Sequence, residues 1–129
     1  MRILFVHQNF PGQYLHIVQR LAHQGSHQLV ALGINELDTD RPLPESLKYF
    51  RYPLAQGNTK GIHRWVMEME SKTIRAEGCA RAAHELKTKG FTPDLICAHP
   101  GWGEALFLKT VWPDSPLLCY QEFFYNHQG

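Results

Sequence analysis

Two short segments of the sequence combine histidine, glycine and aromatic side chains in a pattern that suits ligand binding. Residues 7–12 read His-Gln-Asn-Phe-Pro-Gly, and residues 99–104 read His-Pro-Gly-Trp-Gly-Glu. Each segment directly follows a short apolar run. An imidazole can donate a hydrogen bond or exchange a proton near neutral pH, and a glycine lets the backbone approach a ligand closely. Both segments are therefore candidate parts of a binding or catalytic site.

His99 is the leading candidate for a catalytic residue. Proline at position 100 favours an extended backbone at His99, so the imidazole can point away from a following helix. Gly101 and Gly103 either bring the backbone close to a ligand or form an ordinary turn around Trp102. The alternative for His99 is a histidine that is simply hydrogen-bonded at the end of a strand.

The first segment offers an anion site of a different kind. Gly12 lies just before a predicted helix at 13–24, where free backbone amides and the helix dipole favour an anion such as a diphosphate. Asn9 and Pro11 belong to the same turn. Because there is only one glycine, the dinucleotide fingerprint GxGxxG is absent, and a plain strand-to-helix turn at Pro11 and Gly12 remains an equal interpretation.

Other polar residues near these segments carry weaker signals. Glu104 is expected in the first turn of a helix, where the dipole favours a carboxylate, and we interpret it as structural. Glu122 follows the last predicted strand and joins the candidate binding residues. The aromatic residues at 123–125 behind it are more typical of a core or an interface than of a stacking platform.

Metal and nucleophilic chemistry find little support in the sequence. Eight histidines are present without an HExxH motif, and the one pair spaced by four, His23 and His27, straddles Gly25. No metal site is therefore expected. Cys97 and His99 share a predicted strand face, but a buried strand cysteine is usually inert. The P-loop and GxSxG motifs are also absent.

The hydrophobic pattern predicts the elements that position these residues. Strand-like runs alternate with helical spacing, which indicates an α/β fold: a Rossmann-like, doubly wound, mostly parallel sheet of about five to six strands. In such a sheet the first and fourth strands are neighbours, with their following helices on opposite faces and a crevice at their carboxyl ends. The predicted strands are 2–7, 27–33, 48–52, 95–99 and 116–120, and the predicted helices are 13–24, 62–89 and 103–112.

Composition bounds the class of protein. With 129 residues, 43% hydrophobic residues and a net charge of +1, the chain suits one folded domain and not a phosphate-neutralising nucleic-acid binder. We see neither a secretory h-region nor a run long enough to span a bilayer, although a peripheral membrane contact stays open. Three widely spaced cysteines without a CxxC favour a reducing cytoplasm.

Three stretches together resemble a bacterial group within glycosyltransferase family 4, specifically its N-terminal domain in the GT-B architecture. The stretches are residues 1–13, 93–104 and 120–125, and the run His-Pro-Gly-Trp-Gly-Glu is the most specific of them. The resemblance covers essentially the whole chain, residues 1–129. It implies two Rossmann-like domains that face a cleft, of which this chain would supply the first, mainly acceptor-side one.

The resemblance also implies a reaction. A retaining enzyme of this kind moves a sugar from a nucleotide-diphosphate sugar to an acceptor, here a carbohydrate or a lipid-linked molecule, without a metal or other cofactor. Gly12 matches the position near the donor diphosphate, and His99 matches the position near the transferred sugar. Because the acidic pattern and the nucleotide-binding residues of the second domain are absent, we expect the isolated chain to be inactive.

Two other function classes remain open at this point. One is a stand-alone flavodoxin-like module that binds a small anionic ligand or regulates a partner in the same crevice. The other is a partner-binding fragment that self-associates through its aromatic end. The first strand ends in His7 and Asn9 and lacks the acidic pair of a receiver domain.

Overall fold

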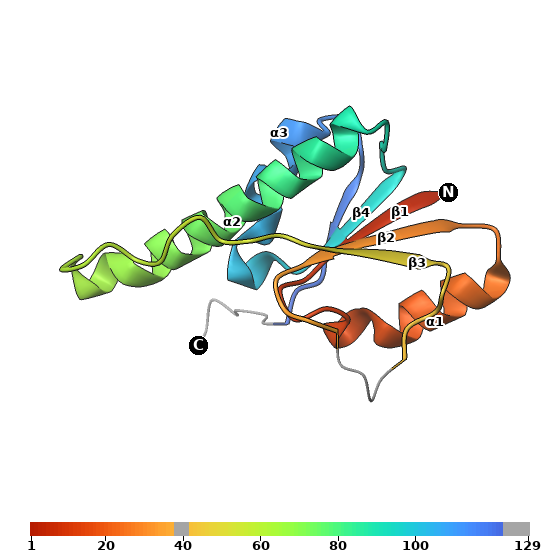
Figure 1. The fold of residues 1–129 in the computed structure, drawn as a ribbon, viewed down its shortest axis with the longest axis horizontal. Helices are drawn as coiled ribbons and strands as arrows, with labels where there is room; N and C mark the ends of the chain where they lie inside the picture. The colour runs from red at the N-terminus through yellow and green to blue at the C-terminus, as the bar shows by residue number, and fades with distance from the viewer. Residues whose placement is uncertain (38–41, 123–129) are drawn as a thin grey trace, which may run out of the picture.

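The computed structural model describes residues 1–37 and 42–122. Its centre is a sheet of five strands that all run parallel, in the order β3-β2-β1-β4-β5 (Figure 1). This confirms the predicted α/β class. The strands are β1 (Arg2–Val6), β2 (Gln28–Gly33), β3 (Leu47–Arg51), β4 (Leu95–Ala98) and β5 (Leu117–Cys119).

The strand order separates two of the predicted topologies. The order 3-2-1-4-5 matches the first five strands of the Rossmann fold, whereas a flavodoxin-like sheet has the order 2-1-3-4-5. The flavodoxin-like alternative is therefore wrong for this chain. The strand order reverses between β1 and β4, which is where an open α/β sheet forms its ligand crevice.

Helices cover both faces of the sheet (Figure 1). On one face lies α1 (Leu15–Gln24), which is preceded by the 3-10 turn η1 (Gly12–Tyr14). On the other lie α2 (Arg64–Thr88) and the short α3 (Leu108–Val111). Among the described residues no helix is both long and apolar enough to cross a membrane.

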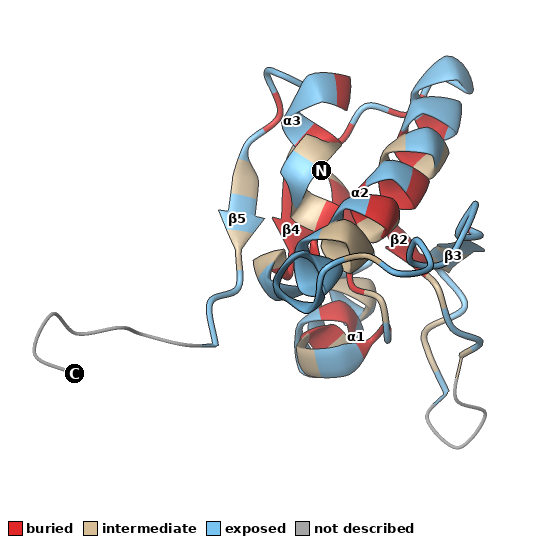
Figure 2. Ribbon diagram, turned by 90° about the vertical axis from the view of Figure 1, so that its left-hand side faces the viewer, coloured by how far each residue is buried: buried red, intermediate tan, exposed pale blue. Residues whose placement is uncertain are grey.

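The core is split into two layers because successive strand residues point to opposite faces. Phe5 and Leu29 pack with Val18 of α1, in one buried cluster. Leu4 and Ile96 belong to a second cluster that also takes in residues of α2 and α3. In Figure 2 the buried residues follow β4 and the sheet-facing side of α2, while β5 at the sheet edge carries none. Burial on both faces explains why β1, β2 and β4 read as continuous apolar runs.

The predicted helix at 103–112 is wrong in form. The chain instead makes two 3-10 turns, η2 (Pro100–Trp102) and η3 (Glu104–Phe107), before the four residues of α3. Gly103, whose φ of 106° is in the left-handed region, ends η2 and separates it from η3. A Cβ at Gly103 would lie 2.2 Å from the carbonyl oxygen of Lys72. The glycine thus lets this loop lie directly against the backbone of α2.

We expect Gly103→Ala to lower the free energy of unfolding by at least about 3 kcal/mol, because it adds a backbone clash to left-handed strain. Gly25, at φ 68°, has nothing within 4 Å of its Cβ position. Gly25→Ala is therefore the matched control and should cost only about 1 to 2 kcal/mol from strain alone. Urea denaturation of both variants measures the difference, and equal losses would contradict the proposed packing of Gly103 on α2.

Candidate functional site

Two buried imidazoles meet at the carboxyl ends of β1 and β4. The rings of His7 and His99 lie edge to face with their centroids 5.4 Å apart. In each ring Nδ1 accepts a hydrogen bond from a backbone amide two residues later, Asn9 N at 3.1 Å and Gly101 N at 3.2 Å. A neutral imidazole has one donor and one acceptor nitrogen. Both Nε2 atoms therefore carry the proton in the neutral rings.

Two glycines create the space for these rings. A Cβ at Gly12 would lie 2.7 Å from Cε1 of His7, and a Cβ at Gly101 would lie 2.8 Å from Cε1 of His99. Each glycine therefore lets a loop backbone fold closely over an imidazole, which any larger residue would displace. Segments 7–12 and 99–104 thus share one arrangement, in which a glycine backbone covers a histidine ring.

Glu122 links the two halves of this arrangement. Its Oε2 atom lies 3.2 Å from Nε2 of His99, and its Oε1 atom accepts a hydrogen bond from the side-chain amide of Gln13. The contact with His99 lacks the alignment of a hydrogen bond, so Nε2 of His99 has no aligned partner among the described residues. The same holds for Nε2 of His7. Two buried N–H donors therefore stand at the crevice with unmet hydrogen-bonding capacity.

The environment of His7 favours its neutral form. Burial lowers the pKa of His7, and the neighbouring His99 lowers it further, while Gln13 and Glu122 act in the opposite direction. Burial dominates because an imidazolium loses hydration when it is removed from water. His7 is thus an uncharged N–H donor at neutral pH.

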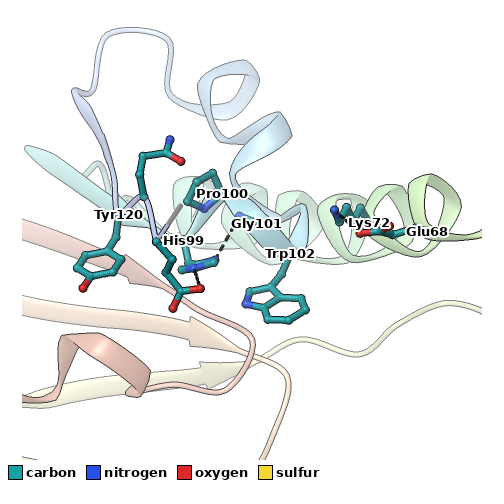
Figure 3. A pocket seen from close by; sticks show the side chains of 9 residues that line it. Glu68, Lys72, His99, Pro100, Gly101, Trp102 and Tyr120 are labelled. Carbon is teal, nitrogen blue, oxygen red and sulfur yellow. Dashed lines mark hydrogen bonds and ion pairs between the residues drawn. The ribbon is translucent and has the colours of Figure 1, made fainter. Parts of the chain in front are cut away.

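A pocket of about 500 Å³ opens beside His99 (Figure 3). The Trp102 ring, 39% exposed, stacks on the His99 ring at a centroid distance of 6.1 Å. Lys72 of α2 lies on the far side of the pocket and pairs with Glu68 at 2.7 Å. The wall therefore offers an aromatic face, an imidazole N–H and one ammonium group within a volume that suits a small polar ligand.

Residues 25–129 match the glycosyl transferase family 4 group. The match covers most of the chain and includes the whole segment from His99 to Glu104, while the turn at 7–12 lies outside it. The chain belongs to the glycosyl transferase family 4 group. This confirms the family resemblance that the sequence indicated.

A solved structure shares the fold of this family 4 domain. It is UGT2 of Phytolacca americana, complexed with UDP-2fluoro-glucose and pterostilbene, a GT-B glycosyltransferase. The two superpose with a TM-score of 0.63 at 13% sequence identity, over 92% of this chain and 30% of the UGT2 chain. The domain thus spans less than a third of that protein's length. No curated protein sequence matches the chain.

The structure brings half of the predicted site residues of this family 4 domain together in one pocket. His99, Gly101, Trp102 and Glu122 line the pocket. Gly103 faces away from the pocket, against α2.

None of residues 7–12 lines the pocket, and the first turn contacts the pocket wall through the rings of His7 and His99. Gly12 covers the ring of His7, and Asn9 donates its backbone N–H to that ring and accepts a side-chain hydrogen bond from Asn35. Pro11 precedes η1 and makes no side-chain cap there. The aromatic residues at 123–125 lie outside the described residues.

Sequence reasoning missed two contributors to the site. His7 was included only as part of its turn, although its place directly after an apolar strand, like that of His99, was a usable signal. Lys72 gave no signal, because its position in the middle of a long helix says nothing about which loop that helix crosses. Among the described residues no group of three His, Cys, Asp or Glu side chains is placed to hold a metal ion.

Glu104 is structural, but for a reason other than the helix dipole. Its side chain is buried, and its Oε1 atom accepts a hydrogen bond of 2.9 Å from the hydroxyl of Tyr52, just after β3. Burial raises the pKa of Glu104, and the hydrogen bond from Tyr52 only partly opposes this. The carboxyl therefore ties the His99 loop to the far side of the sheet.

The alternative nucleophile is also excluded. Cys97 packs in the α1-side cluster, where burial raises the pKa of its thiol to about 11. At neutral pH the group is a protonated thiol, which is a poor nucleophile.

The buried carboxyl predicts a pH effect on stability. The pKa of Glu104 is raised above its ordinary value of 4.5 in the folded state, so the folded protein binds the proton more tightly than the unfolded chain does. Stability from this group is fully present below pH 4.5 and falls as the pH rises through the folded pKa.

Glu104→Gln keeps an oxygen that accepts from Tyr52 but removes the titration. The denaturant midpoint of the wild type should therefore fall relative to that of Glu104→Gln as the pH rises above 4.5. Identical pH profiles for the two proteins would show that Glu104 is not a buried titrating group.

Proposed function

We propose that this domain is the N-terminal, mainly acceptor-side half of a retaining glycosyltransferase. In the whole enzyme a sugar would pass from a nucleotide-diphosphate sugar to a carbohydrate or lipid-linked acceptor. The observation that carries the proposal is the pocket beside His99, which is lined by the segments that follow β4 and β5 and by α2. Membership of the glycosyl transferase family 4 group supports it.

His99 is proposed to contact the transferred sugar. Its Nδ1 atom is held by the amide of Gly101, so Nε2–H is the group left for a ligand. A preorganised N–H donor lowers the barrier when it meets negative charge that develops during transfer. Trp102 offers a flat apolar surface next to that donor, which suits the C–H face of a sugar ring.

Glu122 occupies the approach to His99 when no ligand is bound. Its carboxylate lies 3.2 Å from Nε2 of His99, which is where a sugar hydroxyl would bind. A ligand hydroxyl could replace that contact with an aligned hydrogen bond. The side chain of Glu122, about one-third exposed, would then turn outward and give up its contacts with His99 and Gln13. We therefore assign Glu122 to the binding residues.

The turn at Asn9, Pro11 and Gly12 is proposed to lie beside the donor diphosphate. The first backbone amides of η1 have no intrahelical acceptor, and an anion there is favoured by the helix dipole. No acidic residue stands in the first turn of α1. The nucleotide itself would be held by a second domain, so we propose that residues 1–129 alone do not transfer sugar.

The test is His99→Ala in a form of the protein that includes the nucleotide-binding half. Loss of one preorganised donor should reduce turnover about 10² to 10³-fold, a much larger effect than the accompanying loss of fold stability. His84→Ala is a matched control, because His84 is an exposed histidine on α2, and it should leave both quantities unchanged. Near-normal turnover of His99→Ala together with a large loss of stability would assign His99 to structure alone.

A further inference from the structure

The first half of α2 leaves the body of the domain. Figure 1 shows this part of the helix running past the edge of the sheet, and the buried residues of α2 begin only at Ile74. Trp65 is 80% exposed and Met69 is 65% exposed. A helix in a globular protein is normally stabilised by burying an apolar face. We call residues 60–69 the α2 tip.

One side of the α2 tip is already occupied by the protein itself. Asn58 donates from its side-chain amide to the carbonyl of Met67 at 2.8 Å, and Thr59 donates its backbone N–H to Glu70 at 2.9 Å. Trp65 and Met69 are four residues apart and share the opposite face. That apolar face is therefore the side that the preceding segment leaves uncovered.

The residues that precede Trp65 in the α2 tip carry only positive charge, whereas Glu68, three residues after it, is acidic. Lys60 and Arg64 are exposed and form no ion pair with any described residue, and the first turn of α2 contains no acidic side chain. The acidic residues further along are engaged, since Glu68 pairs with Lys72 and Glu70 binds Thr59. The exposed tryptophan thus follows two basic residues, Lys60 and Arg64, that pair with no acidic side chain among the described residues.

We propose that the α2 tip docks on an anionic lipid surface. Tryptophan is favoured at the boundary between lipid headgroups and acyl chains, and an apolar helix face beside basic residues binds that boundary in the plane of the membrane. Trp65 and Met69 enter the boundary, while Lys60 and Arg64 contact lipid phosphates. A second copy of this chain would cover the apolar face equally well but would not supply negative charge opposite the two cations.

Docking at this place has a consequence for the pocket. Lys72 follows Trp65 by seven residues, which is about 10 Å along the helix and on the same face. Because Lys72 also lines the pocket beside His99, docking holds the pocket mouth close to the lipid headgroups. On the proposed function, the acceptor that this arrangement suits is a lipid-linked one. The docking itself does not depend on sugar transfer.

The experiment is co-sedimentation of the 129-residue protein with vesicles. One set contains phosphatidylcholine alone, and the other contains equal parts of phosphatidylcholine and phosphatidylglycerol. We expect binding to the anionic vesicles that weakens as salt is added. The double variant Trp65→Ser, Met69→Ser should lose at least about tenfold in affinity, because the exposed apolar area no longer enters the boundary.

Two further variants separate the electrostatic contribution to vesicle binding from the apolar contribution. Lys60→Gln with Arg64→Gln should abolish the preference for anionic vesicles and the salt dependence. Leu106→Ser is the matched control, since Leu106 is 59% exposed in η3, away from the α2 tip, and it should bind like the wild type. All of these side chains are exposed, so unchanged circular dichroism and thermal midpoints are expected and checked.

Three outcomes would overturn the proposal. They are a wild type that binds neither kind of vesicle, a Trp65→Ser, Met69→Ser variant that binds as well as the wild type, and a wild type that dimerises through Trp65 in sedimentation velocity without binding vesicles. No nucleotide sugar is present in these experiments, so their result is independent of whether the longer protein transfers sugar.

Discussion

The hydrogen-bonded pairing of β1 with β4 is the constraint on which the site depends. In a parallel pair the two carboxyl ends meet at the same edge of the sheet. The ladder continues past both strands, because His7 donates its backbone N–H to Leu32 and His99 donates to Val6, each at 3.2 Å. The backbone therefore fixes both histidines before any side chain contributes. Trp102 stacks on the His99 ring, and the pocket opens beside that ring. The position of His99 therefore sets the position of both.

The loops around the histidines are held by close packing as well as by hydrogen bonds. Gly12 and Gly101 lie against imidazole rings, and Gly103 lies against the backbone of α2. Such contacts have little freedom to relax, because protein interiors are close-packed. The buried Glu104 accepts a hydrogen bond from the hydroxyl of Tyr52 and so ties the same loop to the residue that follows β3. A site whose donors are held in place before the ligand arrives can stabilise developing charge without reorganisation.

Much of the fold followed from the sequence, because strands covered on both faces leave a continuous apolar signal in β1, β2 and β4. The neighbouring positions of β1 and β4 followed from the rules of doubly wound sheets. Two details could not be predicted from the sequence. The break at Gly103 depends on how closely the loop approaches Lys72, and the hydrogen bond between Glu104 and Tyr52 joins residues 52 positions apart. Both are tertiary contacts, which a local pattern cannot encode.

We propose that His99 and the turn at Gly101 hold the transferred sugar. The most direct measurement is a crystal structure of a longer form of the protein with a non-transferable nucleotide sugar bound. The account predicts the sugar within hydrogen-bonding distance of the His99 imidazole, with Glu122 turned away and the diphosphate beside Gly12. A sugar bound elsewhere, with the contact between His99 and Glu122 intact, would contradict it.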